Sequence, residues 1–184
     1  GESEGRYFGF ASFESEDSMK WLYYMLEAFG DDIKIILHGV SMGSATVMLM
    51  SGNENLPENV KFTVADCGYT SAWDEFAHNF RNVGVPTFPV LNAANFFNKR
   101  ISGYDFKDTD TKAAVAKAKI PMLFIHGDAD KFVPTAMVHP LYEAHPGPKE
   151  LWLAPNTEHA LSYNNYPEEY TQRVETFLHK YAGW

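Results

Sequence analysis

Cysteine is nearly absent from this chain of 184 residues, in which Cys67 is the single example. One cysteine excludes an internal disulfide framework and any cysteine-rich zinc site. His78, His139, His145 and His179 are scattered without the spacing of metal ligands, and we expect no metal and no other cofactor. Cys67 follows an apolar, strand-like stretch, and we therefore expect a buried structural thiol.

Basic residues are also scarce, and they form no run anywhere in the sequence. The chain carries 15 Lys and Arg against 24 Asp and Glu, which gives a net charge of −9. Because phosphate binding needs clustered positive charge, this balance excludes a nucleic-acid partner. No apolar run is long enough to span a bilayer, and no stretch has the pattern of a signal peptide. The low cysteine content suits the cytoplasm.

What the sequence does contain is an alternation of strand-like and helix-like segments. In the segment 16–29, Met19, Leu22 and Leu26 recur at helical spacing, and Gly30 follows the last turn. Short apolar runs that favour buried strands alternate with further helical segments. We expect strands at 33–39, 61–67, 121–127 and 149–155, and helices at 16–29, 42–51, 134–145 and 167–181. This order predicts an α/β fold with a mostly parallel sheet and right-handed crossovers.

The interval 68–119 breaks this alternation. It is rich in aromatic residues and is interrupted by Pro86 and Pro89, so we expect an excursion from the sheet. Such insertions often form lids, and structural padding is the alternative. Since no linker or internal repeat is visible, we expect a single domain over 1–184 with a lid-like insertion at 68–119.

A G-x-S-x-G pattern occupies Gly39–Gly43, between an expected strand and an expected helix. A serine at a tight strand-to-helix turn exposes its hydroxyl, and small residues on either side relieve the crowding. The start of the following helix also presents backbone N–H groups to a developing anion. We therefore interpret Ser41 as a catalytic nucleophile, and an ordinary glycine-flanked turn is the alternative.

A serine hydroxyl is a poor nucleophile unless a histidine accepts its proton and an acid orients that histidine. Two C-terminal segments supply these groups, each after an expected strand: Asp130 in "HGDADKFVP" and His159 in "APNTEHALSY". Loops after the carboxyl ends of parallel strands meet at one edge of the sheet. We therefore expect both residues on the same edge as Ser41.

Three motifs together resemble the α/β-hydrolase family, specifically bacterial serine hydrolases of the prolyl-oligopeptidase and serine-aminopeptidase-like branch. The motifs are "HGVSMGSA", "IHGDADKFVP" and "EHALSY", and they occur in the family's order. The resemblance implies that Ser41 is the nucleophile, Asp130 the acid and His159 the base, with the backbone N–H of Met42 as one oxyanion-hole donor. Relatives can also carry the acid at the position of Asp66, which stays open as the alternative.

The resemblance has a further implication, since the family fold has eight strands and the strands expected here match strands five to eight. We therefore expect an N-terminally incomplete α/β-hydrolase domain without the loop that carries the second oxyanion donor. Loss of one such donor costs about 3 kcal/mol of transition-state stabilisation, so the chain alone should be weakly active or inactive. Strand 33–38 would be an exposed edge, open to self-association or to pairing with the missing N-terminal portion. Because members of this branch can carry an N-terminal membrane segment, a membrane-anchored full-length form stays open beside a cytoplasmic one.

The predicted activity is hydrolysis of carboxylic esters or related acyl compounds through a Ser-His-Asp triad and an acyl-enzyme. A peptidase or an acyltransferase would use the same triad, because fold and triad do not select the acceptor. A catalytically silent fragment that acts as a binding or assembly module is the alternative outside the enzymes. The expected partner is a small-molecule ester or acyl substrate. Six aromatic residues of the insertion are candidates for contact with this substrate, with simple packing against the core as the alternative: Trp73, Phe76, Phe80, Phe88, Phe96 and Phe97.

Overall fold

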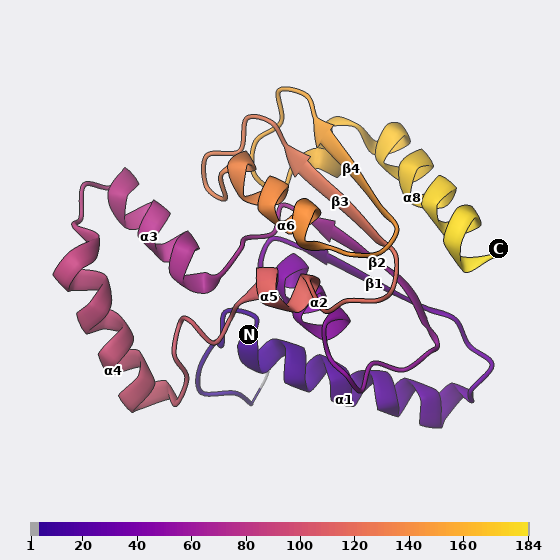
Figure 1. Ribbon diagram of the computed structural model, residues 1–184, viewed down its shortest axis with the longest axis horizontal. Coiled ribbons are helices and arrows are strands. Elements are labelled where there is room, and N and C mark those ends of the chain that lie inside the picture. The colour runs from indigo at the N-terminus through magenta and orange to yellow at the C-terminus, as the bar shows by residue number, and fades with distance from the viewer. Residues whose placement is uncertain (1–3, 184) are drawn as a thin grey trace.

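The computed structural model describes residues 4–183. Four strands form one sheet in the order β1-β2-β3-β4 (Figure 1): β1 (Ile35–Val40), β2 (Val60–Asp66), β3 (Met122–Gly127) and β4 (Lys149–Ala154). All three pairings are parallel, and each connection between neighbouring strands contains at least one helix, as parallel pairing requires. The predicted α/β class is therefore confirmed, and each strand lies within two residues of its expected bounds.

Eight α-helices accompany the sheet in the described part of the chain. They are α1 (Ser12–Phe29), α2 (Met42–Ser51), α3 (Ala72–Asn82), α4 (Asn92–Ser102), α5 (Thr111–Val115), α6 (Val138–Ala144), α7 (Ser162–Asn165) and α8 (Pro167–Ala182). Two short helical turns of other types are η1 (Thr87–Leu91) and η2 (Thr135–Met137). None of the helices within residues 4–183 has the length and apolar character needed to cross a membrane.

Two helices differ from the sequence-based expectation at their N-terminal ends. The first begins at Ser12, four residues early, because the Glu14 carboxylate accepts hydrogen bonds from the N–H groups of Gly9 and Ala11. The helix expected at 134–145 divides into η2 and α6. This division places Pro140 in the first turn of α6, where its missing N–H breaks no hydrogen bond of the helix.

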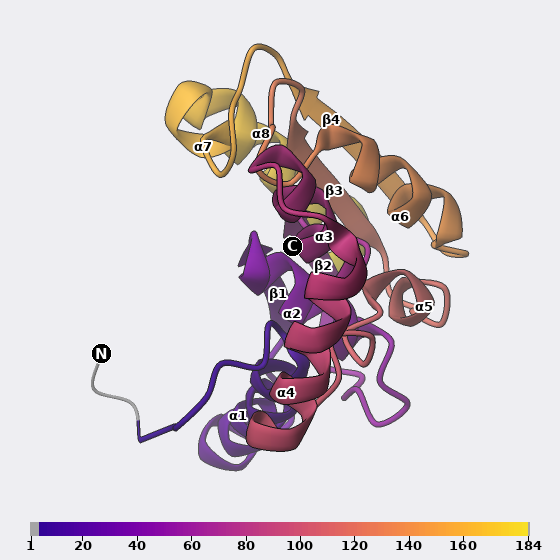
Figure 2. The same cartoon turned by 90° about the vertical axis from the view of Figure 1, so that its left-hand side faces the viewer.

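Side chains of each strand alternate between two apolar faces of the sheet. Leu123 and Ile125 of β3 point to the face covered by α8, where they share a core cluster with Phe177. Met122 and Phe124 point to the opposite face, where residues of α2, α5 and α6 form a second cluster. Figure 2 shows α8 and α6 on opposite sides of the sheet. Because both faces are covered, the central strand β3 is buried along its whole length rather than on alternate residues.

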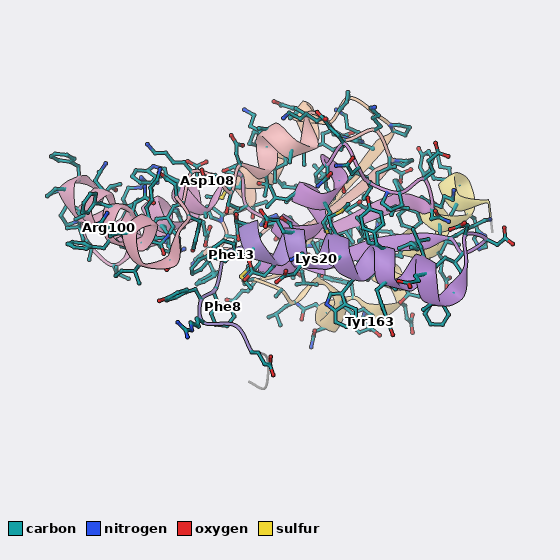
Figure 3. All side chains as sticks on the ribbon, turned by 90° about the horizontal axis from the view of Figure 1, so that it is seen from below. Phe8, Phe13, Lys20, Arg100, Asp108 and Tyr163 are labelled. Carbon is teal, nitrogen blue, oxygen red and sulfur yellow. The ribbon has the colours of Figure 1, made fainter. Side chains whose placement is uncertain are left out.

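The interval 68–119 leaves the sheet and carries α3, η1, α4 and α5. Residues 72–102, here called the arm, extend away from the sheet in Figure 1, and Arg100 lies at the far end of the arm in Figure 3. An isolated antiparallel bridge between Ser71 and Asp110 joins the two ends of this excursion. The use of the arm as a lid stays a prediction.

Strand β1 forms one edge of the sheet, since among the described residues it pairs with β2 alone. Val40, at the end of this strand, is 41% exposed although it is apolar. An unpaired strand edge offers free N–H and C=O groups to another segment of backbone. Pairing through this edge stays a prediction.

Phe177 offers a direct test of the packing between α8 and the sheet. Its side chain is fully buried and meets Phe62 of β2 edge to face, with ring centroids 5.2 Å apart. Phe177→Ala should lower the free energy of unfolding by about 3–5 kcal/mol, because a large core side chain leaves a cavity when truncated. Urea denaturation measures the change. The matched control Phe97→Ala removes a ring that is 58% exposed and should change stability by about 0.5 kcal/mol or less; equal losses in the two variants would contradict the described packing.

Candidate active site

Ser41 occupies a tight turn between the end of β1 and the first residue of α2. Its backbone has φ 56° and ψ −117°, a strained conformation for a residue with a side chain. The turn depends on Gly39, because a Cβ atom there would lie 2.1 Å from the carbonyl oxygen of Gly43. The N–H of Ser41 donates to the carbonyl oxygen of Asp66 at 2.9 Å, which ties the turn to β2. This local structure holds the serine hydroxyl at the carboxyl end of the sheet.

His159 brings the three predicted catalytic residues together. Its Nε2 lies 2.8 Å from Ser41 Oγ, and its Nδ1 lies 2.7 Å from Asp130 Oδ2. Since Asp130 is an acceptor, Nδ1 carries the proton, and the bare Nε2 accepts from the serine hydroxyl. Asp66, the alternative position for the acid, bonds to Ser162 instead. The geometry therefore favours Asp130 as the partner of His159.

The Asp130 carboxylate is held by hydrogen bonds from its own loop and from two histidines. Oδ1 accepts the backbone N–H groups of Phe132 and Val133, at 2.9 and 3.0 Å. Oδ2 accepts a hydrogen bond from His159 Nδ1 at 2.7 Å, and His126 Nε2 lies 3.3 Å from the same oxygen. Burial alone would raise the pKa of Asp130, but the hydrogen bonds from the two histidines outweigh it and lower the pKa to about 2. The carboxylate is therefore ionised at neutral pH.

His126, in β3, is a fully buried histidine. Its Nε2 lies 2.9 Å from the carbonyl oxygen of Val133. The same nitrogen also faces Asp130, a contact that the sequence did not predict. Because both neighbours are acceptors, Nε2 carries the proton of this ring. His126 thus contacts the loop that bears Asp130 at two points, the Val133 carbonyl and the Asp130 carboxylate.

The loops that carry Asp130 and His159 pack directly on each other. A Cβ atom on Gly127 would lie 2.2 Å from the carbonyl oxygen of Thr157, so only glycine permits this approach. The same Thr157 carbonyl accepts the N–H of Ala129 at 3.1 Å. Ala160, directly after His159, has φ 59°. The separation between the acid and the histidine is therefore fixed by backbone contacts as well as by their own hydrogen bond.

Met42, predicted as an oxyanion donor, is the first residue of α2. A backbone N–H in the first turn of a helix has no partner within that helix and points toward its N-terminus, where an anion is favoured. Ser41 lies immediately before it as the N-cap residue. The position of Met42 suits the predicted role, which stays a prediction.

Glu75 is a buried carboxyl group near the site that sequence reasoning missed. It lies on α3 and is 8% exposed. Its Oε1 accepts from Asn79 Nδ2 at 2.6 Å, whereas its Oε2 is buried without a hydrogen-bond partner among the described residues. Burial raises the pKa of Glu75 to about 7. No local pattern distinguishes it from the neighbouring acidic residue in the first turn of the helix, so its burial follows only from how α3 docks.

The six aromatic candidates for substrate contact fall into two groups. Trp73, Phe76 and Phe80 of α3 are partly buried and pack on a core cluster that Met42 also contacts. The other three, on η1 and α4, have exposed side chains: Phe88 is 78%, Phe96 66% and Phe97 58% exposed. Only the first group therefore shares a cluster with a residue of the candidate nucleophile turn, and contact of any of the six with substrate stays a prediction.

Three side chains at this site carry atoms that can bind a metal ion. A sulfur atom of Cys67, a carboxylate oxygen of Asp130 and a ring nitrogen of His159 lie within 4.8 Å of one another. Burial raises the pKa of the Cys67 thiol, which is fully enclosed, and the thiolate is the form that binds metals. Asp130 and His159 are already hydrogen-bonded to each other. We therefore assign no metal to this group.

Comparison with known proteins identifies the family. A family model described as "Serine hydrolase (FSH1)" matches residues 15–161. The chain belongs to this serine hydrolase family. It is also 32% identical over 179 residues to the uncharacterized protein YqkD of Bacillus subtilis (strain 168). That match covers 97% of the chain and 58% of YqkD, so the chain spans little more than half the length of this relative.

Solved structures of α/β hydrolases share the fold. The esterase Pf2001 of Pyrococcus furiosus superimposes with a TM-score of 0.74 and 21% identity, over 99% of the chain and 66% of the esterase. A monoacylglycerol lipase of Paleococcus ferrophilus gives a TM-score of 0.66 and 17% identity, over 89% of the chain and 74% of the lipase. An acylaminoacyl peptidase of Pyrococcus horikoshii superimposes with a TM-score of 0.64 and 14% identity, over 89% of the chain and 26% of the peptidase. The predicted family and fold are confirmed.

The buried carboxyl of Glu75 makes stability depend on pH. Its pKa is raised from 4.5 to about 7, so the folded state holds a proton that the unfolded chain releases at lower pH. The free energy of unfolding should therefore fall by about 3 kcal/mol as pH rises from 4.5 through 7. Glu75→Gln keeps the oxygen that accepts from Asn79 and removes this ionisation.

Glu75→Gln should therefore stabilise the protein by about 3 kcal/mol at pH 9 and by less than about 1 kcal/mol at pH 5. Urea denaturation at the two pH values measures this difference. The control Glu27→Gln changes an exposed glutamate of α1 and should leave the pH dependence as in the wild type. A Glu75→Gln variant whose stability falls with pH as steeply as that of the wild type would refute the assignment.

Proposed function

We propose that this serine hydrolase cleaves carboxylic esters through a triad of Ser41, His159 and Asp130. One observation carries the proposal: the imidazole of His159 lies within hydrogen-bond distance of both the serine hydroxyl and the aspartate, through its two different nitrogens. A triad is recognised by this geometry and by the role of each group. The family and the esterase fold support the same assignment.

The reaction begins when Ser41 Oγ attacks the carbonyl carbon of the ester. His159 Nε2 accepts the hydroxyl proton as the new C–O bond forms, and the carbonyl electrons move onto oxygen. The tetrahedral intermediate then collapses, and the same Nε2 returns the proton to the departing alcohol oxygen. Water cleaves the resulting acyl-enzyme by the same route, which releases the carboxylic acid and restores Ser41.

Asp130 keeps His159 ready for both steps. Its carboxylate holds Nδ1 as the protonated nitrogen, so Nε2 is free to accept a proton. It also stabilises the positive charge that the ring gains when Nε2 is protonated. Because the pKa of Asp130 is about 2, the carboxylate stays ionised and does not take the second proton itself.

The negative oxygen of the intermediate requires hydrogen-bond donors, and we assign the N–H of Met42 as one of them. The positive end of α2 adds to this stabilisation. An oxyanion hole uses two donors, and removal of one costs about 3 kcal/mol, or about a hundredfold in rate. Since the chain spans 58% of YqkD, the turnover proposed here is that of the whole protein.

The substrate class is proposed from the surroundings of the nucleophile. Apolar side chains of α3, including Phe76, form a cluster with Met42, which suits an apolar acyl or alcohol group. Solved structures of an esterase, a lipase and a peptidase all share the fold, so the apolar surroundings of the nucleophile carry the choice of an ester. Peptide hydrolysis is the second candidate, because peptidases share the fold and use the same triad.

Reaction with a fluorophosphonate probe tests the triad in the whole protein. Ser41→Ala should abolish labelling, because the probe forms its bond with the serine oxygen. Asp130→Asn should slow labelling by about 10⁴-fold, because the amide no longer holds the correct tautomer of His159. Mass spectrometry locates the adduct, and Ser18→Ala on α1 is the control, which should label like the wild type. An adduct on any other residue, or labelling of Ser41→Ala, would end the proposal.

A substrate panel separates esters from peptides. Values of kcat/KM for p-nitrophenyl esters of increasing acyl length should exceed those for p-nitroanilides of amino acids, and they should rise with chain length while the apolar cluster accommodates the acyl group. Phe76→Ala should reduce the gain per methylene group, whereas the exposed Phe97→Ala should not. Faster cleavage of the anilides would favour the peptidase.

A further inference from the structure

Asp66 connects two parts of the candidate active site. Its backbone carbonyl accepts the N–H of Ser41 at 2.9 Å, at the turn that carries the nucleophile. Its side-chain Oδ1 accepts a hydrogen bond from Ser162 Oγ at 3.2 Å. Ser162 is fully buried and lies three residues after His159, at the start of α7. One residue at the end of β2 thus touches both the serine turn and the histidine loop.

Two further side chains extend this network. The hydroxyl of Tyr170, on α8, interacts with the Asp66 carboxylate and lies 2.7 Å from His38 Nε2, on β1. Tyr170 is 4% exposed, so this arrangement is fixed by packing. The network therefore joins β1, β2, α7 and α8 directly beside the loop of His159.

A carboxylate is a costly group to place here. Asp66 is 2% exposed, and burial raises its pKa to about 6 against the opposing hydrogen bonds from Ser162 and Tyr170. The surrounding groups that titrate or carry charge include His126, His159, Tyr170 and the Cys67 thiol. Simple packing at the end of β2 needs no carboxylate. A carboxylate here is explained if its hydrogen bond to Ser162 of α7 holds the neighbouring His159 loop in an accurate position.

We propose that Asp66 is a positioning residue for the triad: its backbone fixes the Ser41 turn, and its carboxylate fixes the His159 loop through Ser162. The distance between Ser41 Oγ and His159 Nε2 is then set by one residue that contacts neither atom. The proposal rests on the proposed function, in which that distance governs proton transfer. Displacement by about 1 Å in such an arrangement lowers rates by about a hundredfold.

Four variants test this role. Asp66→Ala and Ser162→Ala each remove one end of the hydrogen bond, their double variant removes both, and Asp66→Asn retains an oxygen that can accept. Thr176→Ala on α8 is a matched control, because within residues 4–183 its hydroxyl donates to the backbone carbonyl of Gln172 in its own helix. The first readout is the rate constant for fluorophosphonate labelling of Ser41. The second is the NMR resonance of the His159 Nδ1 proton in the hydrogen bond to Asp130, which needs no substrate.

Asp66→Ala and Ser162→Ala should each slow labelling by about 10- to 100-fold and shift or broaden the Nδ1 resonance. Because both act on one contact, the double variant should be no slower than the slower single variant. Asp66→Asn should recover labelling to within about threefold of the wild type. Thermal unfolding identifies variants that fail to fold. Ser162→Ala loses a single oxygen atom, so it tests the same hydrogen bond if Asp66→Ala does not fold.

Wild-type labelling and an unchanged Nδ1 resonance in Asp66→Ala would overturn the proposal, as would additive losses in the double variant. These outcomes are distinct from failure of the proposed function. If Ser41→Ala labelled like the wild type, the triad assignment would fall, whereas the Nδ1 resonance would still report whether Asp66 places His159.

Discussion

Parallel pairing of the four strands is the constraint on which the rest of this structure depends. Because every strand runs in the same direction, the loop after each one emerges at the same edge of the sheet. Ser41 follows β1, Asp130 follows β3 and His159 follows β4. Residues 118 positions apart in the sequence therefore meet at 2.8 Å. The apolar strands supply the stability, and the polar loops at their ends supply the chemistry.

Three buried carboxyl groups near this edge behave differently because their partners differ. Asp130 receives two backbone N–H groups and lies beside two histidines, and its pKa falls to about 2. Asp66 and Glu75 receive fewer hydrogen bonds, so burial dominates and their pKa values rise to about 6 and about 7. Only Asp130 therefore stays fully ionised across the neutral pH range. The environment, rather than the type of residue, selects which carboxyl group supports His159.

Much of this arrangement is encoded locally, and the remainder depends on long-range packing. The order of strands, the Ser41 turn and the loops of Asp130 and His159 follow from apolar runs, glycines and their spacing, and these were predicted. The contact of His126 with Asp130 and the burial of Glu75 were not, because each depends on how a helix or loop docks against another. Likewise, nothing in the sequence separates Phe76, which packs against the core, from Phe97, which is exposed.

The bridge between Ser71 and Asp110 has a consequence for how this protein can vary. The chain leaves the body of the domain and re-enters it at nearly the same point, so a change in length between these residues leaves the ends where they are. Closing a longer loop costs little extra entropy, about 0.6 kcal/mol for each doubling of length. Related chains can therefore exchange this whole segment while the sheet and the loops of Ser41, Asp130 and His159 keep their places. Selectivity and reactivity can then evolve as separable properties of one domain.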